Sequence, residues 1–194
     1  MGTLGYAILG LLAKEPRTGY QIARAMNRPI GYIWTARHSQ IYPELASLEA
    51  DGLVRHTVVD GRGPRETKRY EITTTGTAVL RRWIDSPLPT YSPRSELMLR
   101  VWSLWLLPSD RARALIEDIR AEGVERLAQY RIEEQQFIAE GPSKDDREAP
   151  NFGAYATLMW GIAREDRLIE WCDWLIERLA HATDNNSSQS ESRR

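Results

Sequence analysis

The chain of 194 residues has one cysteine and no long apolar run. Its lone Cys172 excludes an intramolecular disulfide and favours a reducing compartment. The longest apolar stretch, residues 101–107, is too short to span a bilayer. The first residues also lack the basic and apolar segments of a secretory signal peptide. These absences predict a cytoplasmic protein that does not engage a membrane.

Motifs of catalysis and of metal binding are lacking as well. The three histidines, His38, His56 and His181, are scattered along the chain, and no HExxH, CxxC or GxSxG pattern occurs. The glycines at 61 and 63 are not followed by the Lys-Ser/Thr pair of a phosphate-cradling loop. We therefore predict no enzymatic activity, no catalytic residues, no metal site and no cofactor.

The charge is divided unevenly, although the net charge is only −1. Residues 1–87 hold 12 Lys and Arg against 8 Asp and Glu, whereas residues 88–194 hold 14 against 19. A basic front half on an acidic back half is typical of a protein whose front half meets phosphate. The excess is modest, and chance is the alternative explanation.

Three short helices are predicted in the front half, because apolar residues recur there at helical spacing. They cover residues 3–14, 19–27 and 39–50. Thr18 and Ser39 are candidate N-caps of the second and third helices. Gly52 is free to end the third helix in a left-handed conformation.

Two strands, residues 53–59 and 67–73, follow these helices and flank a turn rich in glycine and arginine. A further helix is predicted over residues 74–86. This order is that of a winged helix-turn-helix with a two-stranded wing, in which the third helix of the chain enters the major groove.

The back half is predicted to be wholly helical. A proline-rich hinge at 86–93 precedes a helix over 94–107 that is apolar nearly all round and should be buried on several sides. Long amphipathic helices follow over about 110–140 and 151–182. The fold class is thus mainly α, with a winged-helix DNA-binding domain at 1–87, a helical dimerisation and effector domain at 88–182, and a disordered tail at 183–194.

The candidate DNA contacts gather on the third helix, just before it and on the wing. The candidates on the helix and just before it are the polar residues Thr35, His38, Ser39, Gln40 and Tyr42. The candidates on the wing are the basic residues Arg62, Arg65, Lys68 and Arg69. Each has a plainer interpretation. Ser39 can serve only as a cap, Tyr42 can pack on the second helix, and Arg62 and Arg65 can be a solvated turn.

The front half resembles the PadR family of bacterial transcriptional regulators over residues 4–84. The matching motifs include Gly19-Tyr20-Gln21-Ile22, Ser39-Gln40-Ile41-Tyr42-Pro43-Glu44-Leu45 and Arg69-Tyr70-Glu71-Ile72-Thr73. The resemblance implies a homodimer joined by its C-terminal helices that represses a neighbouring operon until a small, often aromatic, ligand binds. It also implies that Ser39, Gln40 and Tyr42 meet the DNA, with Tyr20 a candidate phosphate contact. Tyr20 can instead pack in the core.

Tryptophans in the back half have two interpretations. Trp102, Trp105 and Trp160 can stack on an aromatic effector, with Arg100 and Arg164 as candidate partners for its carboxylate. Alternatively, these rings form the core of the dimer, since interfaces are enriched in tryptophan.

The sequence predicts a sequence-specific regulator, a ligand-responsive repressor, whose partners are double-stranded DNA, a second copy of itself and a small aromatic effector. The alternative is a winged-helix adaptor that binds proteins and not DNA. An adaptor should expose apolar groups on the third helix, whereas this chain places Ser39, Gln40, Tyr42 and Ser47 there.

Overall fold

The computed structural model describes residues 1–27, 38–59, 67–88, 95–139, 146, 149 and 151–191. The chain divides into two compact units, one of residues 1–89 with 147–157 and one of 90–146 with 158–194. We describe each unit by itself. The predicted domain limits after residues 87 and 182 stay predictions.

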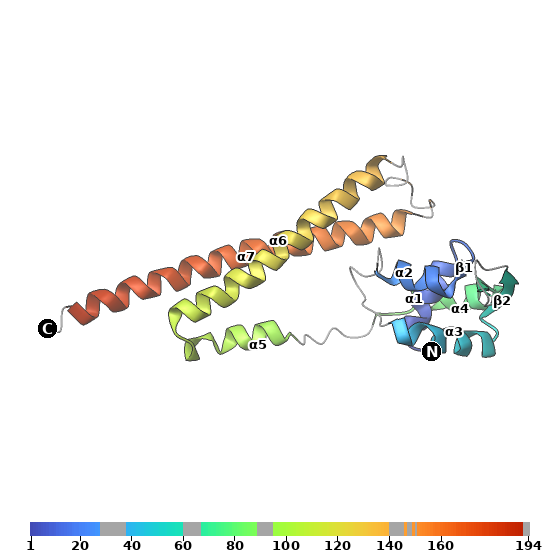
Figure 1. Ribbon diagram of the computed structural model, residues 1–194, viewed down its shortest axis with the longest axis horizontal. Helices are drawn as coiled ribbons and strands as arrows, with labels where there is room; N and C mark the ends of the chain where they lie inside the picture. The colour runs from blue at the N-terminus through green and yellow to red at the C-terminus, as the bar shows by residue number, and fades with distance from the viewer. Residues whose placement is uncertain are drawn as a thin grey trace. The chain divides into compact units, whose positions relative to one another are not determined.

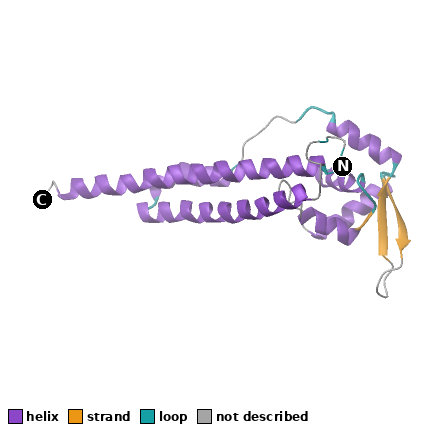
Figure 2. Cartoon of the chain, turned by 90° about the horizontal axis from the view of Figure 1, so that it is seen from above, coloured by secondary structure: helices purple, strands orange, loops and turns teal. Residues whose placement is uncertain are grey.

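The described residues up to 88 of the N-terminal unit form four helices and a small sheet (Figure 1). In chain order these are α1 (Thr3–Leu12), β1 (Arg17–Thr18), α2 (Gly19–Asn27), α3 (His38–Ala50), β2 (Val54–Val59), β3 (Thr67–Ile72) and α4 (Thr74–Ile84). The predicted winged helix-turn-helix is present, and the β2–β3 hairpin extends away from the helices (Figure 2). The sheet differs from the two predicted strands. It is antiparallel with three strands in the order β1-β3-β2, because β1 adds to the outer edge of β3.

The apolar faces of α1, α2 and α3 meet in one core. Its most deeply buried members, each at most 1% exposed, are Ile8, Leu9, Ile22, Met26, Ile41, Leu45 and Leu48. The helix α4 adds Leu80 to this core, and its Trp83 stacks on Tyr6 of α1 with 4.3 Å between ring centroids. The three-helix core therefore fixes how α3 is rotated about its axis.

The predicted N-cap of α2 and the predicted glycine after α3 are confirmed, whereas the predicted N-cap of α3, Ser39, was wrong. Thr18 caps α2 through a reciprocal pair: its N–H donates to Gln21 Oε1 at 2.8 Å, and the Gln21 N–H donates to Thr18 Oγ1 at 3.2 Å. Gly52 adopts a φ of 69° directly after α3. Since α3 begins at His38, Ser39 lies inside its first turn and not before it.

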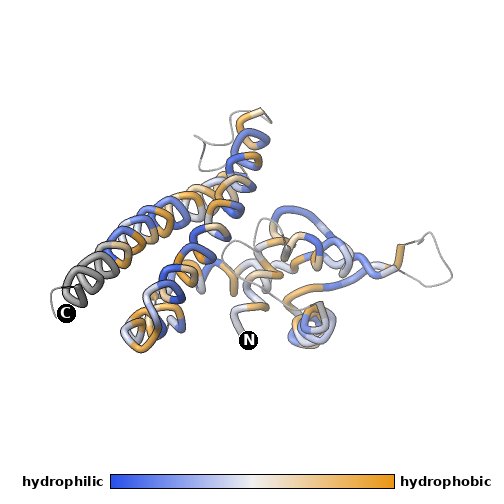
Figure 3. Tube along the Cα trace, turned by 60° about the vertical axis from the view of Figure 1, so that its left-hand side comes forward, coloured by the Kyte–Doolittle hydropathy of each residue, from blue (hydrophilic) through white to orange (hydrophobic). Residues whose placement is uncertain are grey.

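The C-terminal unit is built on two long helices, α6 (Ser109–Ala139) and α7 (Phe152–Glu191), preceded by α5 (Glu96–Trp102) and the 3-10 helix η2 (Leu104–Leu106). Hydrophobic and hydrophilic segments alternate along α6 and α7, as expected of helices with one apolar side (Figure 3). Leu104, Ala112, Ile116 and Cys172 form the buried cluster between them. The helix α7 runs into the segment 183–194, for which the composition predicts disorder.

Cross-helix ion pairs fix the register of α6 against α7. Glu165, 1% exposed, accepts from Arg126 Nε at 3.1 Å and from Arg164 Nη2 at 2.6 Å. Arg120 donates to Asp173 at 2.5 Å further along. Burial lowers the pKa of Arg126, but its hydrogen bonds to Glu165 and Glu122 and its attraction to them outweigh this and raise the pKa.

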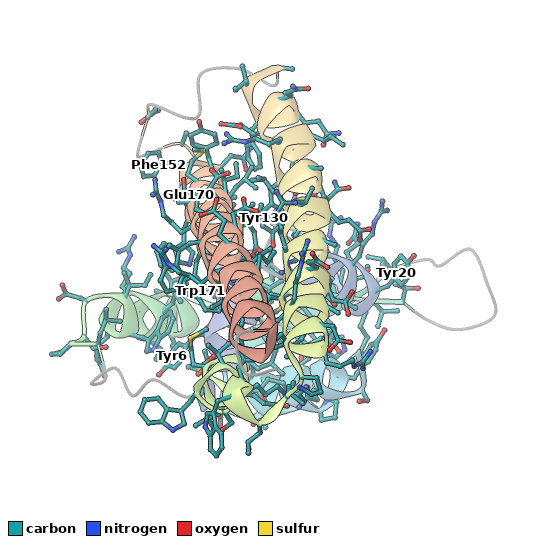
Figure 4. The ribbon with its side chains drawn as sticks, turned by 90° about the vertical axis from the view of Figure 1, so that its left-hand side faces the viewer. Tyr6, Tyr20, Tyr130, Phe152, Glu170 and Trp171 are labelled. Atoms are coloured by element: carbon teal, nitrogen blue, oxygen red, sulfur yellow. The ribbon has the colours of Figure 1, made fainter. Side chains whose placement is uncertain are left out.

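Tyr130 points from α6 toward α7, where its ring lies 3.2 Å from the position that a Cβ atom on Gly161 would take (Figure 4).

The prediction of one buried helix over 94–107 was wrong. Within this chain the segment breaks at Ser103 into α5 and η2, and most of its apolar side chains face solvent. Leu99, Trp102 and Trp105 are 71%, 84% and 80% exposed. The segment is apolar as predicted, but apart from Leu104 and Val101 most of its large side chains are not covered by the described chain. Among the described residues, no helix is both long and apolar enough to cross a bilayer.

We expect Glu165→Gln to lower the free energy of unfolding by about 1–3 kcal/mol, because two guanidiniums lose the charge that both contact. The loss stays below that of a fully buried ion pair, since Arg126 and Arg164 are 39% and 45% exposed. The matched control is Glu170→Gln on the same helix, whose Arg167 pair is exposed and should contribute less than about 0.5 kcal/mol (Figure 4). Urea unfolding followed by circular dichroism measures both, and equal losses would contradict this account.

Candidate nucleic-acid interface

The outward face of α3 carries short polar and small side chains. Ile41, Leu45 and Leu48 point into the core, so the helical period turns the residues between them outward. The exposed residues of this face include Ser39, Gln40, Pro43, Ala46 and Ser47. A face of this composition leaves room for close approach and offers hydrogen-bonding groups near the N-terminal end.

The N-terminus of α2 lies beside this face. The side chains of Thr18 and Gln21 satisfy each other's backbone N–H groups and so hold the first turn in place. Tyr20, in that turn, is 67% exposed and extends outward from the N-terminal unit (Figure 4). The first turn of a helix presents backbone N–H groups and the positive end of the helix dipole, which together favour an anion.

A hollow of about 340 Å³ opens where α2, α3 and β3 meet. The residues that line it are Thr18, Gly19, Tyr20, Tyr42, Thr67, Lys68 and Tyr70. Burial, Glu49 and Tyr42 all raise the pKa of the Tyr70 phenol. The hollow thus combines one ammonium group, phenol and threonine hydroxyls, and a helix N-terminus. Phosphate oxygens are the ligands that such donors bind.

Strand pairing adds further positive charge at this place. β1 pairs with β3 so that Arg17 lies opposite Tyr70 and Thr18 lies opposite Arg69. Burial lowers the pKa of Lys14, and the nearby charge of Arg17 lowers it further. Basic side chains from the turn after α1, from β1 and from β3 therefore lie near one another, although Arg17 is paired with Glu15 at 2.7 Å.

The structure brings together three of the predicted site residues. Tyr20, Tyr42 and Lys68 line the same hollow, and neither tyrosine is a core residue, since they are 67% and 48% exposed. Ser39 and Gln40 lie exposed on the first turn of α3, and Arg69 is exposed on β3. Thr35, Arg62 and Arg65 lie outside the described residues. His38 begins α3, but its side chain is not described.

The three predicted effector residues come from three different elements. Trp102 lies on α5, Trp105 on η2 and Trp160 on α7, with exposed fractions of 84%, 80% and 61%. None of them belongs to the buried cluster between α6 and α7. The two arginines considered for an effector carboxylate are already paired, Arg100 with Glu96 and Arg164 with Glu165. The effector pocket stays a prediction.

Sequence reasoning missed Gly19, Thr67 and Tyr70 in the lining of the hollow and named Thr18 only as a cap. The Thr18-x-x-Gln21 pattern is that of a capping box, and it could have marked the start of α2 as a rigid turn. No local signal identifies the lining residues of β3, because their position depends on the register of a two-residue strand.

Comparison with known proteins agrees with this architecture. Residues 8–82 match the transcriptional regulator PadR-like family, and residues 93–180 match the virulence activator alpha C-terminal family. A probable transcriptional regulator of Mycobacterium tuberculosis is 35% identical over 91% of this chain and 97% of its own length. The chain belongs to the PadR-like family of transcriptional regulators. The resemblance seen in the sequence is thereby confirmed, and the family consists of regulators and not of enzymes.

Other PadR-like proteins extend the similarity to the C-terminal helices. The negative transcriptional regulator PadR of Bacillus subtilis is 30% identical over 92% of this chain and 98% of its own length. Its crystal structure in complex with operator DNA has a TM-score of 0.81 and 28% identity, covering 92% of this chain and 99% of that one. The Vibrio cholerae virulence activator AphA has a TM-score of 0.74 and 26% identity, covering 93% and 99%.

We expect Lys68→Gln to weaken DNA binding and to reduce the slope of log affinity against log salt by about one, because one phosphate contact and its released counterion are lost. The control is Arg113→Gln on α6, which removes one positive charge from the C-terminal unit and should leave that slope unchanged. Fluorescence anisotropy over a series of salt concentrations measures both. If the slope for Lys68→Gln equals that of the unmodified protein, Lys68 does not contact the DNA.

Proposed function

We propose that this PadR-like protein is a homodimeric repressor that binds a palindromic operator and leaves it when a small aromatic acid binds. The observation that carries the proposal is the outward face of α3, which lies next to a cationic hollow at the start of α2. The family supports DNA binding in general, and the relative from Bacillus subtilis has been crystallised with operator DNA. A protein that acts on DNA in this way works in the cytoplasm.

In this proposal α3 lies in the major groove. Gln40 has the amide geometry that pairs with adenine N6 and N7, and the small apolar surfaces of Pro43 and Ala46 suit the methyl group of thymine. Ser39 and Ser47 are short enough to let the helix approach the base edges. The exposed side chains of α3 include no large aliphatic residue, which argues against the adaptor that binds proteins.

Phosphate contacts come from the hollow. Tyr20, Tyr42 and Lys68 would surround one backbone phosphate at the positive end of α2. These contacts fix the depth and the register of α3 in the groove but carry no sequence information. The wing residues Arg62 and Arg65 would extend the phosphate contacts along the DNA, as their charge alone suggests.

The dimer proposal rests on the apolar surface of α5 and η2. Met98, Leu99, Trp102, Trp105 and Leu106 are all exposed within nine consecutive residues. Apolar patches of this kind mark interaction sites, and tryptophan is enriched at protein interfaces. We propose that a second copy covers them. A two-fold dimer then presents two copies of α3, which requires half-sites separated by about one helical turn or a multiple of it.

The ligand proposal rests on the ligand that a relative binds and on the exposed aromatic rings of this chain. PadR of Bacillus subtilis has been crystallised with p-coumaric acid. Trp160, which lies outside the proposed dimer surface, is the candidate stacking surface for such a ligand, and Trp102 and Trp105 take that role only if a second copy does not cover them. The ligand would release DNA only if it binds one arrangement of the two DNA-reading units more tightly than the other.

We expect the full-length protein to form a specific, salt-sensitive complex with the DNA immediately upstream of its own gene, and p-coumaric acid to weaken that complex. Gel-shift titrations at two salt concentrations, against a scrambled fragment of equal length, measure the first effect.

Gln40→Ala should lower affinity for the operator more than for scrambled DNA, because it removes a base contact. Equal affinity for both fragments would refute operator binding, and unchanged affinity with every aromatic acid tested would refute the ligand response.

We expect the double substitution Trp102→Ala and Trp105→Ala to shift the protein from dimer to monomer in sedimentation velocity. Two large rings would leave the proposed interface, and such anchors commonly contribute more than 1 kcal/mol each. Val58→Ala is the control, since it shortens an exposed apolar side chain on β2 of the N-terminal unit and should leave the dimer intact. A dimer that persists in the double variant at low micromolar concentration would contradict this surface.

A further inference from the structure

We propose that Gly19 is a positioning residue for Tyr42. The missing side chain at position 19 lets the Tyr42 ring lie over the first turn of α2, and this contact directs the phenol into the hollow. The inference rests on the proposed DNA-binding function and deepens it, because it names what holds one of the proposed contacts in place.

The contact between the two residues is close. A Cβ atom built on Gly19 would lie 2.5 Å from Tyr42 Cε1, 3.2 Å from Cζ and 3.3 Å from Cδ1. Two non-bonded carbon atoms favour 3.5–4.0 Å, so any side chain at position 19 forces the ring to move. Both residues also line the hollow.

The backbone gives no other reason for a glycine at this position. Gly19 is the first residue of α2 and has a helical conformation. Among the described residues, only Gly52 has the positive φ that favours glycine. Alanine normally stabilises a helix relative to glycine. The space that the Tyr42 ring occupies is therefore the feature that excludes a side chain.

The backbone at Gly19 is held from both sides and cannot withdraw from the ring. Thr18, immediately before it, pairs with Arg69 of β3 and takes part in the capping box with Gln21. Tyr42 is 48% exposed, so its ring has room to turn. A methyl group at position 19 should therefore turn the ring outward and leave the fold intact.

A double-mutant cycle tests the inference with the full-length protein and its upstream operator. The variants are Gly19→Ala, Tyr42→Ala and the two combined. We expect Gly19→Ala to weaken operator binding on the order of five-fold, as the loss of one ordinary hydrogen bond would, and to within two-fold of Tyr42→Ala. In the Tyr42→Ala background, Gly19→Ala should have no further effect, because the clash is gone.

Gly10→Ala is the matched control. Gly10 lies on α1, and nothing stands within 4 Å of a Cβ built there. It should leave operator binding unchanged. Two results would overturn the inference: a Gly19→Ala variant that binds like the unmodified protein, or an equal loss from Gly19→Ala with and without Tyr42. The second result would mean that position 19 acts on the DNA directly and not through the ring.

Thermal unfolding of the same four proteins keeps this test separate from the proposed function. Gly19→Ala should raise the midpoint in the Tyr42→Ala background and raise it less, or lower it, when Tyr42 is present. Identical shifts in both backgrounds would refute the contact even if the protein binds DNA. A protein that binds no DNA but shows this coupling would refute the proposed function and support the contact between Gly19 and Tyr42.

Discussion

Burial of one side of α3 is the constraint on which the rest of the structure depends. Ile41, Leu45 and Leu48 are at most 1% exposed in the core that α1 and α2 complete. Successive residues of a helix are separated by about 100°, so fixing these three side chains also fixes which residues face outward. Both ends of the helix are held as well: Tyr42 lies on Gly19, and Glu49 contacts His56 of β2 at 2.5 Å. The same packing that stabilises the N-terminal unit thus leaves Gln40, Pro43 and Ser47 exposed on the opposite side of the helix.

The hollow depends on this arrangement and on the sheet. β3 pairs with β1 on one side and with β2 on the other, which places Lys68 beside the start of α2. Thr18 belongs at once to the pairing of β1 and to the cap of α2, and it joins the sheet to the helix that precedes α3. A cation, a helix N-terminus and three phenols are therefore brought together by residues distant in sequence. The proposed division of labour follows: α3 reads bases, and the hollow holds phosphate.

Much of this architecture could be predicted from the sequence, because regular periods and caps are local signals. The spacing of Ile41, Leu45 and Leu48 predicted both the helix and its outward face, and Thr18 and Gly52 marked helix ends that the structure confirms. β1 could not be predicted, since two residues show no period. The hollow and the place of Gly19 depend on contacts between separate elements. The side chains of α5 were wrongly predicted to be buried, because an apolar pattern does not say whether the same chain or another molecule covers it.

Directed cleavage of DNA from α3 tests the central claim most directly. The single cysteine, Cys172, is fully buried, so Ala50→Cys at the exposed end of α3 can carry an iron-EDTA group by itself. Our account predicts cleavage of the upstream operator in two short clusters, one in each half-site and related by the two-fold axis of the DNA. Operator binding without localised cleavage from this position, together with localised cleavage from the same label at Arg81→Cys on α4, would contradict it.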